Sequence, residues 1–420
     1  MCRKVWSLLL CLLLLLPCLA RAAENRQDYP LEQVLVLSRH NIRAPLAGRD
    51  STLAKLTPHA WFAWRCRAGE LSPKGGELEM LMGQYFREWL EQEELLERNA
   101  QPAPGEVRFY ANSFQRTIAT ARYFSVGMLP LANVPIEHHE AVNESDPVFL
   151  PGLGKVSEDF HGQVLAEFQS AGLEQQLREQ GQRSFHLIQQ VLDFSQSPYA
   201  QAKGTEFPPA DILPVTEGSY TLRSPFKPLA PASDALVLQY YEEENDLQAS
   251  FGHELTWQDW QEIASLKEMG INALFSLPTA AKVLAHPLLD VMHEELATEG
   301  RKFTFLCGHD VNLAEVLPAL GVEEYTLPDS IEAKTPIGAK LVIEKRRGRD
   351  GQAYAALSLI YASTQQLRSR TPLNLAAPPS RCPLHLKGLQ TNEDGLYLFS
   401  DLQQRLAKAS AEGKSWQLPQ

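Results

Sequence analysis

Residues 33–46 read QVLVLSRHNIRAPL, a short apolar run followed at once by charge. The run at 34–37 is aliphatic and partly β-branched, which is typical of a strand buried on both faces of a sheet. Arg39 and Arg43 then bracket His40, and Pro45 prevents a helix from starting there. We therefore expect a central strand that ends in a charged loop, where open α/β sheets bind their ligands.

The charged loop has the composition of a site for a small, doubly charged anion. Each guanidinium, of Arg39 and of Arg43, can bind two oxygens of such an anion at once. These cations also disfavour the protonated form of His40, so that its imidazole stays neutral and nucleophilic. Considered alone, the loop is equally consistent with a solvated basic turn.

The N-terminus has the parts of a secretory signal peptide, which we assign to residues 1–22. Arg3 and Lys4 precede an apolar run at 8–16, and Ala20-Arg21-Ala22 fits a cleavage site. That run is too short for a comfortable membrane span. We therefore expect a soluble protein exported after cleavage.

Removal of this leader changes the charge and the cysteine count. It takes away three cations and no acid, which moves the net charge from -12 to -15 and argues against binding to nucleic acid or an anionic membrane. Three of the six cysteines also leave. The remaining Cys66, Cys307 and Cys382 allow at most one disulfide within the chain, and their pairing stays open.

Two later segments repeat the order strand, polar turn, helix. A strand at 107–111 leads to Asn112-Ser113, a predicted N-cap for a helix at 115–126. Arg116 falls in the first turn of that helix, where a cation opposes the helix dipole, so anion binding explains it better than a structural role. A third strand at 303–307 is followed by His309 and Asp310 and by a helix that begins near residue 312.

The rest of the chain predicts a sheet domain interrupted by helices. Apolar residues at 78–90 recur with spacings of three and one, the stripe of a core helix, and 339–344 and 354–361 flank a polar turn, as in a hairpin. Residues 151–285 are richer in Gln, Glu and Pro, with helical stretches at 166–191 and 257–274. We expect an α/β domain at 23–150 and 286–420 with a mostly parallel sheet, and a mainly helical insertion at 151–285.

If the three strands are parallel, their polar turns meet at one sheet edge. Arg39, Arg43 and Arg116 could then surround one tetrahedral dianion, with His309 beside them. His40 could attack phosphorus, and Asp310 could protonate the leaving alkoxide and later assist water. The sequence therefore predicts phosphoryl transfer through a phosphohistidine.

The motif RHNIRAP at 39–45, with the later His309-Asp310, resembles the histidine acid phosphatase family, and most closely its glucose-1-phosphatase branch. The stretches SRHNIRAPL, KGGELEMLMGQYFREWL, YANSFQRTIATA, LQYYE, GHDVN and TPIGAKLV carry the resemblance in order over nearly the whole mature chain. It implies a three-layer, phosphoglycerate-mutase-like α/β/α fold, a periplasmic location, no cofactor and no metal. The implied substrate is a small phosphate monoester, either a sugar phosphate or phytate, and a homodimer stays open.

The resemblance also implies roles for single residues. His40 would be the phosphorylated nucleophile and Asp310 the proton donor, while Arg39, Arg43, Arg116 and His309 would hold phosphate. The family usually has glycine where this chain has Asn41, and the glucose-1-phosphatase branch has asparagine. In that branch a glutamate of the inserted domain narrows the pocket. Our candidates for it are Glu217 and, as the alternative, Glu242.

Three alternatives remain. A phytase would keep the chemistry and change the substrate, and a mutase-like transferase would pass the phosphoryl group to an alcohol instead of water. A non-catalytic phosphosugar-binding protein would require a lost nucleophile or acid, but His40 and Asp310 are both present. His138-His139-Glu140 lacks the spacing of a metal motif, so we predict no metal site there.

Overall fold

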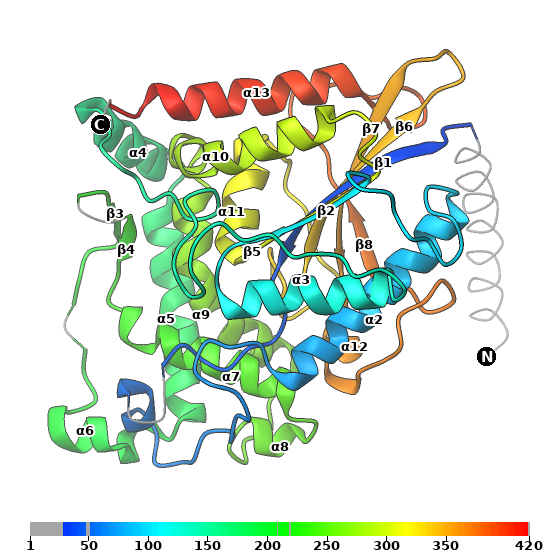
Figure 1. The fold of residues 1–420 in the computed structure, drawn as a ribbon. Helices are drawn as coiled ribbons and strands as arrows, with labels where there is room; N and C mark the ends of the chain where they lie inside the picture. Colours follow the sequence, from blue (N-terminus) through cyan, green and yellow to red (C-terminus); the bar gives the residue numbers. More distant parts are fainter. Residues whose placement is uncertain (1–27, 48–50, 208, 218–219, 419–420) are drawn as a thin grey trace, which may run out of the picture.

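A mixed sheet forms the centre of the protein, with strands in the order β2-β5-β1-β6-β7-β8 and β9 paired to β7. The computed structural model describes residues 28–47, 51–207, 209–217 and 220–418 (Figure 1), so the predicted signal peptide lies outside it. The strands are β1 Leu31–Arg39, β2 Val107–Ala111, β5 Phe303–Gly308, β6 Lys340–Arg347, β7 Ala353–Tyr361, β8 Ser380–Pro383 and β9 Tyr397–Leu398.

β1 lies in the middle of this sheet and is buried on both faces, as its apolar run predicts. Val34 and Val36 enter one hydrophobic cluster, and Leu35 and Leu37 enter the other. β1 and β2 both pair in parallel with β5, whereas β6, β7 and β8 follow as antiparallel neighbours. The three strands that end in polar turns are therefore parallel, and those turns lie at one edge.

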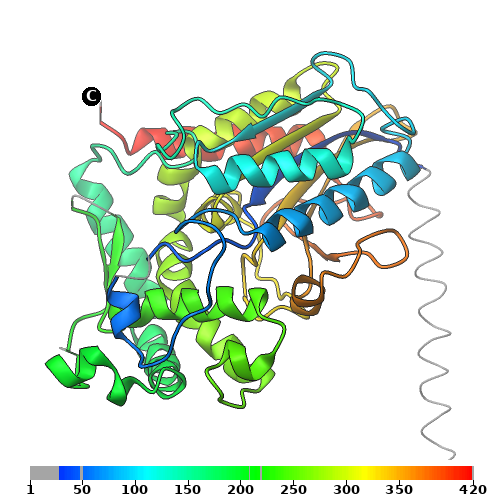
Figure 2. The same cartoon turned by 60° about the horizontal axis from the view of Figure 1, so that its bottom comes forward.

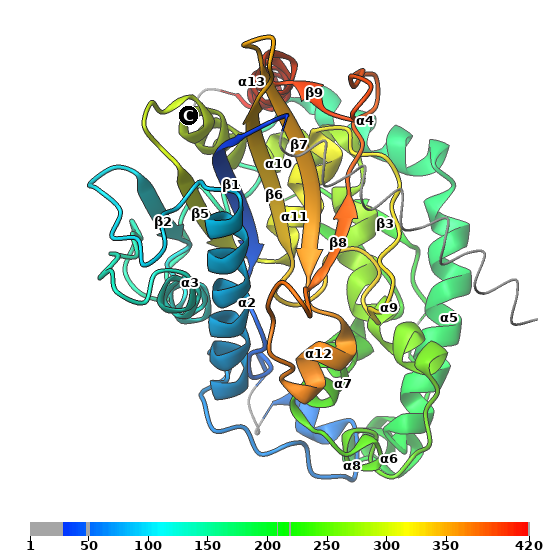
Figure 3. The ribbon, with the colours of Figure 1, turned by 90° about the vertical axis from the view of Figure 1, so that its right-hand side faces the viewer.

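Helices cover both faces of the sheet and give the predicted three layers (Figures 2 and 3). α2 (Pro73–Gln92) and α3 (Gln115–Met128) pack together on one face, and α2 is the predicted amphipathic helix. α10 (Pro278–Ala297), α11 (Asp310–Ala319) and α13 (Phe399–Ser415) cover the other face. The predicted α/β class is confirmed, and so is the β6–β7 hairpin.

Most of the segment between β2 and β5 is helical. The helix expected at 166–191 is broken at Gly172, whose φ of 64° places it in the left-handed region. The predicted boundary at 285/286 falls inside α10. The elements of this segment are α4 Glu158–Ser170, α5 Leu173–Val191, α6 Pro198–Lys203, β3 Leu213–Val215, β4 Thr221–Arg223, α7 Ala230–Glu242, α8 Asp246–Ala249 and α9 Trp257–Phe275. Two short helices lie between them, η2 Phe194–Gln196 and η3 Lys227–Leu229. Two further short helices lie elsewhere in the chain, η1 Thr52–Lys55 and α12 Thr364–Ser369.

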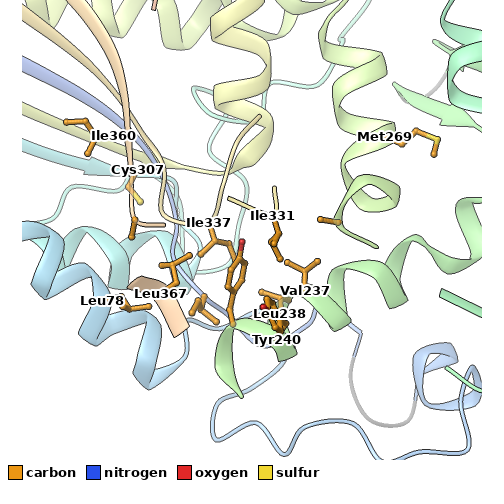
Figure 4. Packing of buried hydrophobic residues seen from close by; sticks show 14 of the residues in the cluster. Leu78, Val237, Leu238, Tyr240, Met269, Cys307, Ile331, Ile337, Ile360 and Leu367 are labelled. Atoms are coloured by element: carbon orange, nitrogen blue, oxygen red, sulfur yellow. The ribbon is translucent and has the colours of Figure 1, made fainter. Parts of the chain in front are cut away.

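These inserted helices share one hydrophobic cluster with the sheet. Val237, Leu238 and Met269 belong to the same buried cluster as Cys307 and Ile360. Figure 4 shows Ile331 and Ile337 between the two groups. Because apolar contacts continue across the junction, burial holds the inserted helices beside the edge where the polar turns meet.

The three cysteines of the described chain, Cys66, Cys307 and Cys382, are free thiols. Cys307 is buried in β5, as expected of an unreactive core residue. Within the ranges that the structure describes, no helix combines the length and the apolarity needed to cross a membrane.

Two glycines allow α2 and α3 to touch backbone to backbone. A methyl group on Gly83 would collide with the carbonyl oxygen of Phe124, and one on Gly127 with that of Met80. We expect Gly83→Ala and Gly127→Ala to destabilise the protein by about 1–3 kcal/mol, because backbone cannot yield as a side chain can. Thermal unfolding followed by circular dichroism would measure this.

The matched control is Gly162→Ala on exposed α4, where an added methyl group meets nothing within 4 Å. It should stabilise the helix by up to about 1 kcal/mol. Equal melting temperatures for all three variants would contradict the close contact.

Candidate active site

The site begins where β1 ends, because Arg39 is the last residue of that strand and His40 the next. Arg39 pairs in register with Gly308 of β5, and the His40 amide donates to the Gly308 carbonyl at 3.0 Å. This pairing places His309 beside His40, with ring centroids 5.5 Å apart and planes at 73°. His40 and His309, which are far apart in sequence, thus lie side by side at the carboxyl ends of β1 and β5.

His40 is buried and has a defined tautomer. Its Nδ1 lies 2.8 Å from the carbonyl oxygen of Asn41, which can only accept, so Nδ1 carries the proton and Nε2 keeps its lone pair. Burial first, and then the positive charges of Arg116, Arg43 and Arg39, lower the pKa of His40 well below its ordinary value. The predicted neutral, nucleophilic imidazole is therefore what this surrounding favours.

Arg39 is fully buried and held by carboxylates. Its Nη1 donates to Glu332 Oε1 at 2.8 Å, and its Nη2 lies 3.4 Å from Asp310 Oδ2. Burial opposes its charge, yet Glu332 and Asp310 outweigh burial and raise the pKa of Arg39. Glu332 also accepts hydrogen bonds from Lys267 of α9, Tyr241 of α7 and the Ile337 amide. Arg39 is thus a fixed positive charge at the end of β1.

Arg43 and Arg116 complete the positive cluster. Arg43 Nη1 pairs with Asp234 Oδ2 of α7 at 3.1 Å. Arg116 lies over the Phe114 ring at 4.6 Å, and burial followed by the charge of Arg43 lowers the pKa of Arg116 to about 10. Among the described side chains, the Nε atoms of Arg39 and Arg116 are buried and have no hydrogen-bond acceptor.

The hydrogen-bond network also assigns the tautomer of His309. Asn112 Oδ1 accepts from the amides of Ser113 and Asp146, so its Nδ2 must be the donor to His309 Nε2 at 2.8 Å. Neutral His309 therefore carries its proton on Nδ1, which lies 3.3 Å from Arg116 Nη2. Two donors face each other there, and an anion oxygen could accept from both.

Burial, followed by the charges of Arg116, Arg43 and Arg39, lowers the pKa of His309 to about 3 even though Asp310 opposes the shift. Asp310 begins α11 and its side chain is partly exposed. Burial raises the pKa of Asp310, but Arg39, Lys267, Arg43 and His309 hold it well below its usual range. Without a bound anion, Asp310 is ionised.

The structure thus brings together His40, Arg39, Arg43, Arg116, His309 and Asp310. In the described part of the chain, neither glutamate candidate forms a hydrogen bond or ion pair with these six residues. Glu217 is exposed between β3 and β4, and Glu242 accepts from Ser72 Oγ at 3.0 Å beside the start of α2. The role of either residue as a pocket gate stays a prediction.

Sequence reasoning missed four residues around this cluster. Asp234, Lys267 and Glu332 lie on helices or loops far along the chain, and no local motif marks them. Asn112 was predicted as an N-cap residue together with Ser113, which is wrong. Phe114 occupies the N-cap, and Asn143 Oδ1 accepts from the Gln115 amide. The Asn112 Oδ1 cannot cap the helix because it already accepts from the amides of Ser113 and Asp146. The position of Asn112 directly after β2 is the sequence signal that could have identified it as a residue of the site.

The His138-His139-Glu140 stretch is used in other ways. His139 stacks on Tyr110 with centroids 4.4 Å apart, and His138 Nδ1 bonds the Glu140 carbonyl. In the part of the chain that the structure describes, no cluster of three or more His, Cys, Asp or Glu side chains could hold a metal ion.

Comparison with known proteins agrees with this geometry. A model of the histidine phosphatase superfamily (branch 2) matches residues 30–359. A glucose-1-phosphatase of Salmonella typhimurium is 37% identical over 391 residues, which cover 91% of this chain and 93% of the relative. One from Providencia rettgeri is 32% identical over 92% of this chain and 94% of its own length.

Phytases are similar as well. An Escherichia coli phytase is 28% identical over 88% of this chain and 89% of its own length. The apo structure of Hafnia alvei phytase superposes with a TM-score of 0.82 at 28% identity, covering 93% of this chain and 99% of that one. From the family model and these relatives, the chain belongs to the histidine phosphatase superfamily (branch 2) and is a phosphatase.

Proposed function

We propose that the protein is an exported, metal-independent acid phosphomonoesterase that hydrolyses glucose 1-phosphate through a phosphohistidine on His40. The observation that carries this proposal is the buried, neutral His40, which feels the charges of three guanidiniums and has the His309 ring 5.5 Å away. A nucleophile and a set of donors for a dianion thus occur together. The guanidiniums supply the positive charge that phosphoryl transfer requires.

In the first half-reaction, His40 Nε2 forms a bond to phosphorus while the bond from phosphorus to the sugar oxygen breaks. Arg39, Arg43, Arg116 and His309 donate to the non-bridging oxygens. Asp310 transfers its proton to the leaving alkoxide, which departs as glucose. In the second half-reaction, ionised Asp310 takes a proton from water, the water oxygen bonds to phosphorus, and the N–P bond breaks to release phosphate.

Asp310 must gain its proton before it can act as an acid. In the free site the surrounding cations hold its pKa down. A phosphate dianion bound by the arginines neutralises those cations and adds negative charge beside the carboxyl, which raises its pKa. Substrate binding thus prepares the acid that the substrate needs.

The charge distribution favours a substrate with one phosphate. Asp234 and Asp310 are each about one-fifth exposed, and they lie beside Arg43 and Arg39. The Asp234 carboxylate offsets positive charge that further phosphates of phytate would need, and it can accept hydrogen bonds from sugar hydroxyls. The two relatives with 37% and 32% identity are glucose-1-phosphatases, which supports the same substrate.

Export and domain division belong to this proposal too. The leader at 1–22 would direct the chain to the periplasm, and 151–285 would form an insertion in the α/β domain. Its α7 contributes Asp234, which supports a role for the insertion at the substrate site. Neither a cofactor nor nucleic acid has a part in the proposed reaction.

The substrate can be tested with the ratio of kcat/KM for glucose 1-phosphate to that for phytate, at about pH 5 with excess chelator. We expect a ratio well above one because of the Asp234 carboxylate beside Arg43. A ratio well below one would make the protein a phytase. Loss of activity in chelator would contradict the metal-free mechanism, and binding without turnover would indicate a phosphosugar-binding protein.

The proton donor can be tested by leaving-group dependence. Asp310→Asn should lower kcat for glucose 1-phosphate by about 10²- to 10⁴-fold, the usual contribution of a general acid. Nitrophenyl phosphate should be affected far less, because its leaving group needs no proton. Asp234→Asn is the matched control, and it should not discriminate by leaving group. Equal losses on both substrates in Asp310→Asn would contradict the assignment.

The pH dependence follows from the same two groups. The pKa of His40 is lowered, so the nucleophile stays deprotonated as the pH falls from 7 to 5. Protonated Asp310 in the substrate complex is lost as the pH rises. We therefore expect kcat for glucose 1-phosphate to fall between pH 5 and 8 in the wild type. In Asp310→Asn the slope should vanish, and a wild-type rate that rises with pH would refute this account.

A further inference from the structure

Directly beneath the nucleophile loop lies a fully buried ion pair that the proposed chemistry does not use. Lys340 Nζ of β6 donates to both carboxylate oxygens of Glu79 of α2, at 3.1 and 3.0 Å, and both side chains are inaccessible to solvent. Lys340 also donates to the Gly338 carbonyl at 2.9 Å. Burying two charges is costly, and apolar residues could join a helix to a sheet equally well. The pair therefore requires a further explanation.

Asn41 connects this ion pair to His40. Its Nδ2 donates to Glu79 Oε1 at 2.7 Å, and its Oδ1 accepts from the Ile42 amide at 2.8 Å. That amide belongs to the peptide unit whose carbonyl accepts from His40 Nδ1. The Asn41 side chain therefore binds the N–H of the 41–42 peptide, and the C=O of the same peptide accepts from His40 Nδ1.

The surroundings of Asn41 are built to fit its side chain. Gly338 has φ of 69°, and a methyl group on it would lie 2.7 Å from Asn41 Nδ2 and 3.2 Å from Glu79 Oε1. The Gly338 amide also donates to the His40 carbonyl at 3.2 Å. Thr120 Oγ1 accepts from the Asn41 amide at 3.2 Å. A bare glycine thus leaves the space that the amide of Asn41 fills.

We propose that Asn41 is a positioning residue, and that the buried Glu79–Lys340 pair acts through it. Glu79 holds the Asn41 amide, Asn41 fixes the 41–42 peptide, and this peptide keeps the proton on His40 Nδ1 and directs Nε2 at phosphorus. Burial raises the pKa of Glu79, and Lys340 opposes this shift and keeps the carboxylate an acceptor for the donors Asn41 Nδ2 and Lys340 Nζ. The inference rests on the proposed function, because it requires His40 to be the nucleophile.

The first test is Asn41→Ala, which removes the link and leaves the ion pair in place. We expect kcat to fall by about 10- to 100-fold, the scale of a misplaced reacting group, while KM changes less than about threefold. The single-turnover rate of phosphate transfer to His40, measured by rapid quench with labelled substrate, should fall by the same factor. The melting temperature shows whether folding is affected, and a purely structural residue would not lower kcat selectively.

The second test asks whether the ion pair acts through Asn41. Glu79→Leu with Lys340→Met removes the acceptor and the charge together, and kcat should fall as in Asn41→Ala. Adding Asn41→Ala to that double variant should lower kcat no further, because effects transmitted through one link do not multiply. Glu79→Gln with Lys340→Met is the matched control. It keeps an amide oxygen for Asn41 and should retain kcat within about threefold.

Separate outcomes overturn the two ideas. Wild-type kcat in Asn41→Ala, a loss confined to KM, or losses that multiply with those of the ion-pair variant would overturn the positioning role and leave the mechanism intact. Turnover by His40→Ala, or no labelled phosphate trapped on the wild type, would overturn the phosphohistidine mechanism and the positioning role with it. If the apolar double variant does not fold, Asn41→Ala and the glutamine control still decide.

Discussion

The hydrogen bond and ion pair between Arg39 and Glu332 is the contact on which the site and the domain arrangement both depend. A guanidinium without solvent at the end of a central strand is stable only with a carboxylate partner. Glu332 provides that partner and also binds Lys267 of α9 and Tyr241 of α7. The same carboxylate thus keeps the strand end charged and ties the inserted helices to it.

From this contact the charge pattern of the site follows. Arg39, Arg43 and Arg116 are concentrated on one edge of an acidic protein, and each is held by burial, a carboxylate or an aromatic face. The imidazoles between them are neutral because burial, and then repulsion by the arginines, disfavours a further positive charge. The folded protein thus holds like charges close together. Binding of a dianion relieves the repulsion between them.

Part of the site could be predicted because its signal is local. The residues after β1, β2 and β5 follow apolar runs in the sequence, and parallel pairing brings such turns together whatever lies between them. Arg39, His40, Arg43, Arg116, His309 and Asp310 were all found in this way. The three-layer fold was predictable from the same runs and from the apolar stripe of α2.

The remaining site residues depend on tertiary contacts that leave no local pattern. Asp234 reaches Arg43 across 191 residues, and Glu332 reaches Arg39 across 293. Either carboxylate looks like an ordinary acid in its own segment. Asn112 illustrates a different difficulty. Its residue type suits a helix cap as well as an imidazole partner, and only the packing of β5 beside β2 selects between these uses.

The position of β1 between β5 and β6 also determines when, during synthesis of the chain, the central sheet can form. Both hydrogen-bonded neighbours of that strand come from residues beyond 300, so a nascent chain carries His40 long before any partner strand has been made. Until then, this strand, whose centre is apolar, has two unpaired edges, which invite aggregation. Closing so long a loop is slow as well as late. The sheet around β1 can therefore be completed only after residues 303–347 have been synthesised.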